Sequence, residues 1–249
     1  MSFAGKTAVV AGGGGGMGLK IANDLVDQGA RVAVMDIKDA PDELRQGDGE
    51  ATYHQGDVTD EEFVRSVIDG FVSGVGRLDY LVNTTGVLWF DRDKSCVEMD
   101  MDVWDRVMAI NVKSFALTAR YAVPAMKRTG GGAMVHISSM DALRGDDKPQ
   151  DAYGVSKAGV IRLSKSLAIQ FAADGIRSNC ILPGPIYSPM QARWDNNDAA
   201  IQAINGFVPL GRVGQVEDIS NAAMFLLSDK ASYITGVDLP IDGGCLARP

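Results

Sequence analysis

Short apolar runs rich in β-branched residues alternate along the chain with longer segments in which apolar residues recur every three or four positions. The short runs predict strands and the longer segments predict amphipathic helices. The predicted strands are residues 7–11, 31–35, 51–55, 78–82, 133–137, 177–182 and 233–239. The predicted helices are residues 19–29, 61–71, 101–126 with a break near Pro124, the segment that carries Tyr153, and residues 216–227.

This alternation predicts an α/β fold, one doubly wound, seven-stranded parallel sheet with helices on both faces. Composition does not change along the chain, and no linker or internal repeat divides it, so residues 1–249 are predicted to form a single domain. The long segment 186–213 shows no clear pattern and is expected to be an irregular insertion. Long loops of this kind are often substrate lids, although a loosely packed surface insertion is the alternative.

The composition is that of an ordinary globular protein, with 46% hydrophobic and 22% charged residues. The net charge of −8 and the scattered basic residues exclude nucleic acid as the main partner. No apolar run is long enough to span a membrane, and the first residues do not resemble a signal peptide. A cytoplasmic protein that does not bind membranes is therefore expected.

The cysteines and histidines suggest neither a disulfide framework nor a metal site. Cys96, Cys180 and Cys245 are odd in number and far apart, which favours free thiols in a reducing compartment. His54 and His136 have no ligand spacing to cysteines or carboxylates. We therefore expect no metal.

A glycine-rich turn, residues 12–18, separates the first strand from the first helix. Glycines at such a turn let the backbone approach a pyrophosphate, whose charge then lies at the positive end of the helix. The sequence thus predicts a dinucleotide site, although a glycine run could also be only a flexible turn.

Asp36 follows the second strand and could accept hydrogen bonds from both hydroxyls of an adenosine ribose. Because a carboxylate would repel a 2′-phosphate, this residue favours NAD over NADP. Lys38 is the nearest cation and keeps the NADP alternative open. Asp57 follows the third strand and could meet the adenine amino group, whereas Thr59 or Asp60 could be only a helix cap.

Asn83 and Gly86 follow the fourth strand, and Ser139 follows the fifth. Ligands of parallel sheets bind at the carboxyl ends of the strands, so these residues are expected to share one site with Gly16 and Asp36. Tyr153 and Lys157, four apart on a predicted helix, share a face. An ammonium group beside a phenol favours the phenolate, which suits an acid/base role; a chance surface pair is the alternative.

Taken together, these residues resemble the short-chain dehydrogenase/reductase family over residues 6–244. The resemblance rests on the glycine spacing Gly12, Gly16 and Gly18, on Asp57-Val58-Thr59, Asn83 with Gly86, Asn111, Ser139, Tyr153 with Lys157, Pro183-Gly184 and Pro209-Leu210-Gly211-Arg212. It implies a Rossmann-type fold and a nicotinamide cofactor that serves the interconversion of alcohols and carbonyl compounds.

The resemblance implies a role for each of four catalytic residues. Tyr153 would be the acid/base, and Lys157 would lower the pKa of the phenol and hold the nicotinamide ribose. Ser139 would bind the substrate oxygen. Asn111 would hold a water molecule that connects Lys157 to solvent. The implied cofactor-binding residues are Gly12, Gly16, Met17, Gly18, Asp36, Asp57, Val58, Asn83, Gly86, Tyr153, Lys157, Pro183, Gly184, Ile186 and Ser188.

The chain departs from the family pattern in two turns and one loop. Ala11 stands where the family usually has Thr, and Thr84-Thr85 where it has Asn-Ala. We expect a hydroxyl of Thr84 or Thr85 to replace the one lost at Ala11. The loop of residues 141–150 is one residue longer than usual and strongly charged, which suits either a polar substrate's entrance or a solvated turn.

The predicted function is NAD-dependent interconversion of a secondary alcohol and its ketone, with Tyr153 as acid/base and a small molecule as substrate. Relatives of this size usually assemble as homotetramers, and the resemblance implies the same assembly here. An apolar substrate wall, suited to a cyclic or aromatic alcohol, is predicted from Leu88, Trp89, Phe90, Met140, Met190 and Trp194. The alternatives are an NADP-dependent ketone or 3-oxoacyl reductase, a non-catalytic NAD-binding protein and a methyltransferase.

Overall fold

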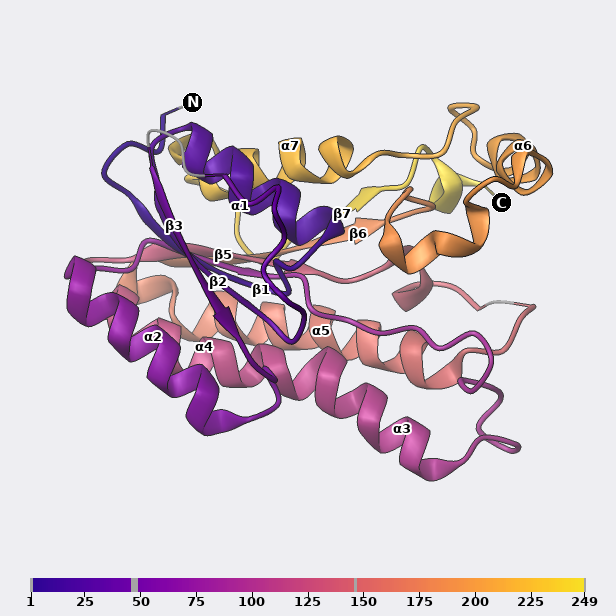
Figure 1. Ribbon diagram of the computed structural model, residues 1–249, viewed down its shortest axis with the longest axis horizontal. Helices are drawn as coiled ribbons and strands as arrows, with labels where there is room; N and C mark the ends of the chain where they lie inside the picture. The colour runs from indigo at the N-terminus through magenta and orange to yellow at the C-terminus, as the bar shows by residue number, and fades with distance from the viewer. Residues whose placement is uncertain (1, 46–48, 146, 249) are drawn as a thin grey trace.

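Seven parallel strands form one sheet at the centre of the computed structural model, which describes residues 2–45, 49–145 and 147–248 (Figure 1). The strand order is β3-β2-β1-β4-β5-β6-β7. The strands are β1 (Thr7–Ala11), β2 (Arg31–Asp36), β3 (Glu50–Gln55), β4 (Tyr80–Asn83), β5 (Gly132–Ile137), β6 (Ile176–Pro183) and β7 (Asp238–Ile241). The predicted doubly wound α/β sheet is confirmed.

Helices cover both faces of the sheet, as Figure 1 shows, with α1, α6 and α7 on one face and α2, α4 and α5 on the other. They are α1 (Gly16–Asp27), α2 (Glu61–Val75), α3 (Met101–Met108), α4 (Ser114–Arg128), α5 (Asp151–Gln170), α6 (Asp198–Phe207) and α7 (Val216–Leu227). Successive strand residues enter opposite cores: Val10 packs with α1 and α7, and Val9 with α2 and α4. A strand buried on both faces must be apolar throughout, which explains the short apolar runs.

The predicted helix of residues 101–126 is three joined pieces, and the predicted break near Pro124 is wrong. A π-helical turn, η1 (Ala109–Lys113), joins α3 to α4, and Pro124 lies inside α4. Proline removes one backbone donor, but its neighbours Val123 and Ala125 are buried against the sheet. This packing keeps the helix intact beyond the proline.

The predicted irregular segment of residues 186–213 is instead largely helical. It contains a 3₁₀ helix, η4 (Pro189–Trp194), followed by α6. Asn197 begins α6 by accepting a hydrogen bond from the Ala200 amide at 3.1 Å. Ile201 and Ile204 are three residues apart, so the helical signal was present but short.

The last strand begins later than predicted, at Asp238 instead of residue 233. Tyr233 is fully exposed, and the Ile234 amide donates to the Ala231 carbonyl in a turn. Gly236 has φ = 74°, a left-handed conformation that interrupts an extended chain. The strand can begin only after that glycine.

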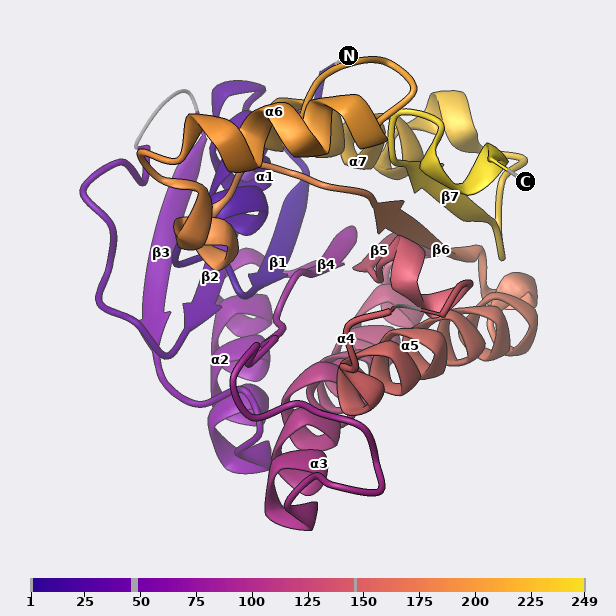
Figure 2. The same cartoon turned by 90° about the vertical axis from the view of Figure 1, so that its right-hand side faces the viewer.

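The carboxyl ends of the strands lie at one edge of the sheet, which faces the viewer in Figure 2 with α6 and α7 on one side and α3, α4 and α5 on the other. In the described part of the chain, no helix is both long and apolar enough to cross a membrane. No group of three or more His, Cys, Asp or Glu residues among the described ones could hold a metal ion.

Candidate active site

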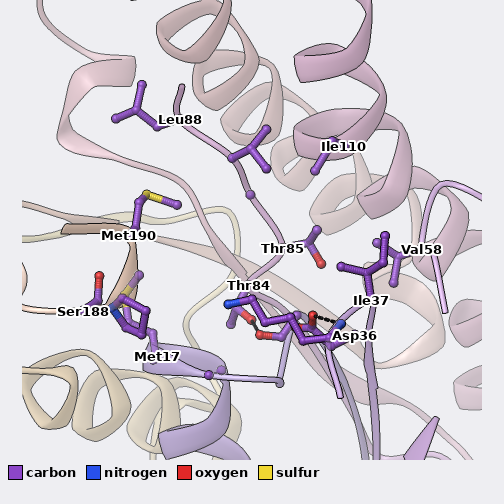
Figure 3. Close-up of a pocket in the computed structure, with 18 of the residues that line it drawn as sticks. Met17, Asp36, Ile37, Val58, Thr84, Thr85, Leu88, Ile110, Ser188 and Met190 are labelled. Carbon is purple, nitrogen blue, oxygen red and sulfur yellow. Dashed lines mark hydrogen bonds between the residues drawn. The ribbon is translucent and has the colours of Figure 1, made fainter. Parts of the chain in front are cut away.

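A cavity of about 370 Å³ lies where β1, β2 and β4 end. Figure 3 shows Met17, Asp36, Val58, Ser188 and Met190 around it. The structure thus brings together nine of the predicted cofactor residues: Gly12, Gly16, Met17, Gly18, Asp36, Asp57, Val58, Gly86 and Ser188.

The glycine turn lies so close to neighbouring backbone that side chains would not fit. A Cβ on Gly18 would stand 2.2 Å from the Gly12 carbonyl oxygen. A Cβ on Gly12, whose φ is 87°, would stand 2.5 Å from the Thr85 amide nitrogen. The turn therefore holds β1, the start of α1 and the residues after β4 together, and the cavity floor is bare backbone.

The first turn of α1 suits an anion. Its N-cap, Gly15, provides no side-chain hydrogen bond, and no acidic residue occupies the first turn. The free amide groups and the positive end of the helix dipole therefore remain for a ligand. A phosphate group is the usual ligand of such a helix end beside a glycine turn.

Asp36, at the end of β2, presents its carboxylate to this cavity. One oxygen accepts from the Gly14 amide at 2.9 Å, and the other accepts from the Lys38 amide at 3.1 Å. The ammonium of Lys38 lies 3.9 Å from where a Cβ on Gly15 would be. An acid and a base therefore both lie beside the glycine turn.

Asp57 lines the cavity but already has protein partners for both oxygens. One accepts from the amide and hydroxyl of Thr59, at 2.8 and 2.7 Å, and the other from Arg106 at 3.0 Å. Burial acts to raise its pKa, but the bonds from Thr59 and Arg106 hold it below the ordinary value. Asp57 is thus a carboxylate whose position is fixed by hydrogen bonds to both oxygens.

Asn83 does not line this cavity. Its side chain is fully buried, accepts from the Thr118 hydroxyl at 2.8 Å and lies 3.1 Å from Nδ1 of His136. Its amide joins β4 to β5 and α4.

Three further predicted cofactor residues, Pro183, Gly184 and Ile186, also lie outside the cavity. A Cβ on Gly184 would stand 2.6 Å from Cα of Asp242, and Ile186 forms a β-bridge with Gly214.

The predicted catalytic residues meet beside the cavity. Tyr153 and Lys157 lie on α5, and Tyr153 shares a hydrogen bond with Ser139 at the end of β5. The Lys157 ammonium lies 5.7 Å from the Tyr153 ring centroid and donates to the Ile137 carbonyl at 3.1 Å. A Cβ on Gly86 would stand 3.0 Å from this ammonium. Gly86 therefore connects the catalytic group to the cavity.

The pKa of Tyr153 departs from its ordinary value in the direction opposite to that expected. Burial raises it to about 12, the charge of Asp141 acts in the same direction, and the bond with Ser139 opposes them. Burial also lowers the pKa of Lys157 to about 8. Burial and the charge of Asp141 set the net direction here, and the expectation that Lys157 lowers the phenol pKa stays a prediction.

Asn111 lies in the π-helical turn and is fully buried. Its side chain donates to the Val87 carbonyl and the Ser156 hydroxyl, both at 3.0 Å, and accepts from the Val87 amide at 2.8 Å. π-Helical turns often occur at functional sites. Here the turn joins the segment after β4 to α5, while the water-holding role of Asn111 remains a prediction.

Asp93 is a site residue that sequence reasoning missed. Its carboxylate is buried and accepts from the amides of Ala152 and Tyr153, at 3.1 and 2.8 Å, so it caps the helix that carries the predicted catalytic pair. Burial raises its pKa. Sequence gave no signal for this contact, because 60 positions separate Asp93 from Tyr153.

Thr84, in the turn after β4, provides the hydroxyl that is missing at Ala11, which confirms that expectation. Its hydroxyl lies 2.9 Å from the carbonyl oxygens of both Ala11 and Gly12. Thr85 does not share this role, since its hydroxyl oxygen is buried and has no hydrogen-bond partner among the described residues.

The predicted apolar wall is only partly present. Leu88, Trp89 and Met190 line the cavity. Phe90 is instead exposed beneath Arg193, whose guanidinium carbon lies 3.7 Å from the ring centroid. Trp194 and Met140 are buried, Met140 in a small cluster with Val208 and Cys245.

Comparison with known proteins agrees with this geometry. The family model described as enoyl-(acyl carrier protein) reductase matches residues 12–245. The chain is 34% identical to cis-4-hydroxycyclohexanecarboxylate dehydrogenase of Sinomonas cyclohexanicum, over 99% of this chain and 98% of the relative. It is 33% identical to 2,5-dichloro-2,5-cyclohexadiene-1,4-diol dehydrogenase LinX of Sphingobium indicum, over 97% and 96%.

A solved structure is also similar over almost the whole chain. It is that of a short-chain dehydrogenase/reductase from Burkholderia xenovorans, with a TM-score of 0.92, 31% identity and coverage of 99% of this chain and 98% of the other. Matches of this extent, in sequence and in structure, show the family. The chain belongs to the short-chain dehydrogenase/reductase family and is an oxidoreductase that uses a nicotinamide cofactor.

Proposed function

We propose that the protein interconverts a secondary alcohol and its ketone, with NAD as the cofactor. The observation that carries this proposal is the buried group of Ser139, Tyr153 and Lys157 beside the cavity, connected to it at Gly86. Binding alone would not require a buried phenol, hydroxyl and ammonium in contact with one another. This supports catalysis over the alternative of a non-catalytic NAD-binding protein, and a methyltransferase has no use for the pair.

The residues around the cavity fit a dinucleotide. The bare glycine turn and the uncapped start of α1 suit the pyrophosphate, and the Asp36 carboxylate suits the adenosine ribose. Gly86 leaves room for a ribose close to Lys157. A bound nicotinamide would supply the hydride acceptor for oxidation and the hydride donor for reduction.

The side chains of the protein supply the proton chemistry. In the oxidation direction, the Tyr153 phenolate takes the proton of the substrate hydroxyl while the carbinol carbon loses its hydride, and a C=O bond forms. Ser139 donates a hydrogen bond to the substrate oxygen and stabilises its developing charge. In reduction the Tyr153 phenol returns the proton. Because burial raises the pKa of Tyr153 to about 12, the protein alone favours the phenol, and the positive charge of an oxidised nicotinamide would lower that pKa.

NADP is a second candidate because of one observation. The Lys38 ammonium lies beside the glycine turn, 3.9 Å from where a Cβ on Gly15 would be, and a cation there suits a 2′-phosphate. Asp36 opposes this, since a phosphate there would meet a carboxylate that already accepts from Gly14 and Lys38 amides. We give the carboxylate more weight because it stands at the strand end, whereas Lys38 is a flexible side chain.

The names of relatives support a ring alcohol as the substrate, because two of them act on hydroxylated six-membered rings. Leu88, Trp89 and Met190 provide an apolar wall that suits such a ring. The test is to follow reduced-cofactor absorbance with a panel of cyclic secondary alcohols, with NAD and with NADP, for wild type and Asp36→Ala. We expect turnover with NAD and a shift towards NADP in the variant. Tight NAD binding without turnover of any alcohol or ketone would contradict the proposal.

A homotetramer in the cytoplasm remains a prediction. A groove between α4 and α5, lined by Ala119, Val123, Leu163 and Phe171 among others, supports assembly through these helices. Light scattering tests it, and a monomer at micromolar concentration would contradict it.

A further inference from the structure

Asp141 lies directly behind the catalytic serine and belongs to none of the motifs that identify the family. Its Oδ2 is 3.3 Å from the Ser139 hydroxyl oxygen, and its backbone amide donates to that oxygen at 3.1 Å. Its charge also acts on Tyr153. A carboxylate thus stands one hydrogen bond away from the position where Ser139 would hold the substrate oxygen.

The carboxylate is held in place from two sides. Oδ1 accepts from Nε of Arg144 at 2.9 Å, and Oδ2 accepts from Nε2 of Gln150 at 3.4 Å. Gln150 directly precedes α5, the helix of Tyr153. The side chain of Asp141 is only 16% exposed. Arg144 in turn places its guanidinium carbon 5.6 Å from the ring centroid of Phe207, the last residue of α6.

The two oxygens of Asp141 differ in their capacity to accept a further hydrogen bond. Oδ1 has a bond of ordinary length to a guanidinium, whereas both contacts of Oδ2, at 3.3 and 3.4 Å, are at the long end of the hydrogen-bond range. A carboxylate oxygen can accept two good bonds, so a shorter bond from a ligand hydroxyl can replace either contact. The acceptor that remains is therefore the one beside Ser139.

We propose that Asp141 binds a second hydroxyl of the substrate, so that the preferred substrate class is a diol with a hydroxyl on the carbon next to the reacting carbinol. This inference rests on the proposed function and deepens it. Ser139 would hold the reacting oxygen while Asp141 accepts from its neighbour. The two protein oxygens are 3.3 Å apart, so both can be reached by hydroxyls on adjacent carbons.

Charge decides between substrate classes at this position. A carboxylate or phosphate next to the carbinol would be repelled by Asp141. An ammonium is less favoured than a hydroxyl, because Arg144 already neutralises the carboxylate. A neutral donor gains a charge-assisted hydrogen bond without needing an unpaired charge, and such bonds are about twice as strong as neutral ones.

The experiment compares cis-cyclohexane-1,2-diol with cyclohexanol, using NAD, in wild type, Asp141→Ala and Asp141→Asn. We expect wild type to prefer the diol in kcat/KM and Asp141→Ala to lose about 10- to 100-fold of that preference. Any effect that acts through Tyr153 is common to both substrates and cancels in the ratio. Asp91→Asn is the matched control, since it removes one negative charge from a side chain that is 84% exposed.

Three results would overturn the inference: a wild-type preference for cyclohexanol, an equal fall for both substrates in Asp141→Ala, or a preference for trans-2-aminocyclohexanol over the diol. The second would mean that Asp141 only braces its loop. If Asp141→Ala does not fold, the same ratio in Asp141→Asn decides. If no alcohol turns over, the proposed function fails. The binding role of Asp141 is then tested separately, by calorimetric binding of the diol to wild type and to the Asp141 variant with NADH present. Equal affinities for the diol would overturn the inference.

Discussion

The candidate cofactor cavity and the predicted catalytic group lie at one edge of the sheet but are built from different kinds of contact. In the cavity the closest approaches are between backbone atoms, such as Gly18 with Gly12. In the predicted catalytic group the closest contacts are hydrogen bonds made by buried polar side chains, to one another or to backbone. The bonds of Asn111 and Asp93 are examples. An added methyl group should therefore damage the first region, whereas a removed polar group should damage the second.

Gly18→Ala tests this difference at its largest expected effect. The new Cβ would stand 2.2 Å from the Gly12 carbonyl oxygen and 2.4 Å from the Thr84 hydroxyl, so the glycine turn must shift. Strain of about 1–3 kcal/mol corresponds to roughly 10- to 100-fold weaker NAD binding, measurable by calorimetry. Gly70→Ala in α2, where a Cβ would meet nothing within 4 Å, is the control and should leave the affinity unchanged. Equal affinities in the two variants would contradict the account of the turn.

Asp93→Ala is the corresponding test in the catalytic group. It leaves the amides of Ala152 and Tyr153 without their acceptor, which costs about 1–3 kcal/mol of stability. Because Tyr153 itself loses a backbone bond, we also expect kcat to fall about tenfold, since small displacements of reacting groups slow catalysis strongly.

Asp60→Ala separates positioning from stability. Asp60 is the N-cap of α2, where it accepts from the Glu62 amide at 2.9 Å, and α2 carries no predicted catalytic residue. We expect a similar loss of melting temperature and an unchanged kcat. If the two variants lost kcat equally, Asp93 would have no positioning role.

Thr84→Val has the smallest expected effect. It removes the bonds from this hydroxyl to the Ala11 and Gly12 carbonyls, at a cost of about 1 kcal/mol, and it weakens NAD binding slightly because Gly12 lines the cavity. Thr52→Val, on an exposed position of β3, should change stability by less than about 0.5 kcal/mol. An unaltered melting temperature and cofactor affinity in Thr84→Val would contradict this role.

Local patterns predicted most of the fold, and the reasons for each failure are physical. Apolar runs predicted the central strands because burial on both faces requires them. The predicted start of β7 was too early because Gly236 interrupts the extended chain. Helix α6 was not predicted because its apolar pattern is short. Pro124 stays helical because tertiary packing outweighs the loss of one donor.

In the candidate site, too, some residues could be predicted from local patterns and others only from the fold. The placement of motif residues such as Gly18, Tyr153 and Lys157 at or beside the cavity could be predicted because it depends on local spacing. Asp93 could not, since only the fold brings it to α5. The sign of the Tyr153 pKa shift also depended on burial and on Asp141, which no local pattern reveals.

The most direct test of the account is the pH dependence of alcohol oxidation in wild type and Tyr153→Phe. Lys157, Ser139 and Asp141 surround the phenol, and burial raises its pKa to about 12, so the reactive phenolate becomes more abundant as pH rises. We therefore predict that wild-type kcat/KM for oxidation rises with pH. In Tyr153→Phe we predict a rate lower by about 10²–10⁴-fold with this rise abolished. A variant that keeps both the rate and the pH dependence of wild type would contradict Tyr153 as the acid/base.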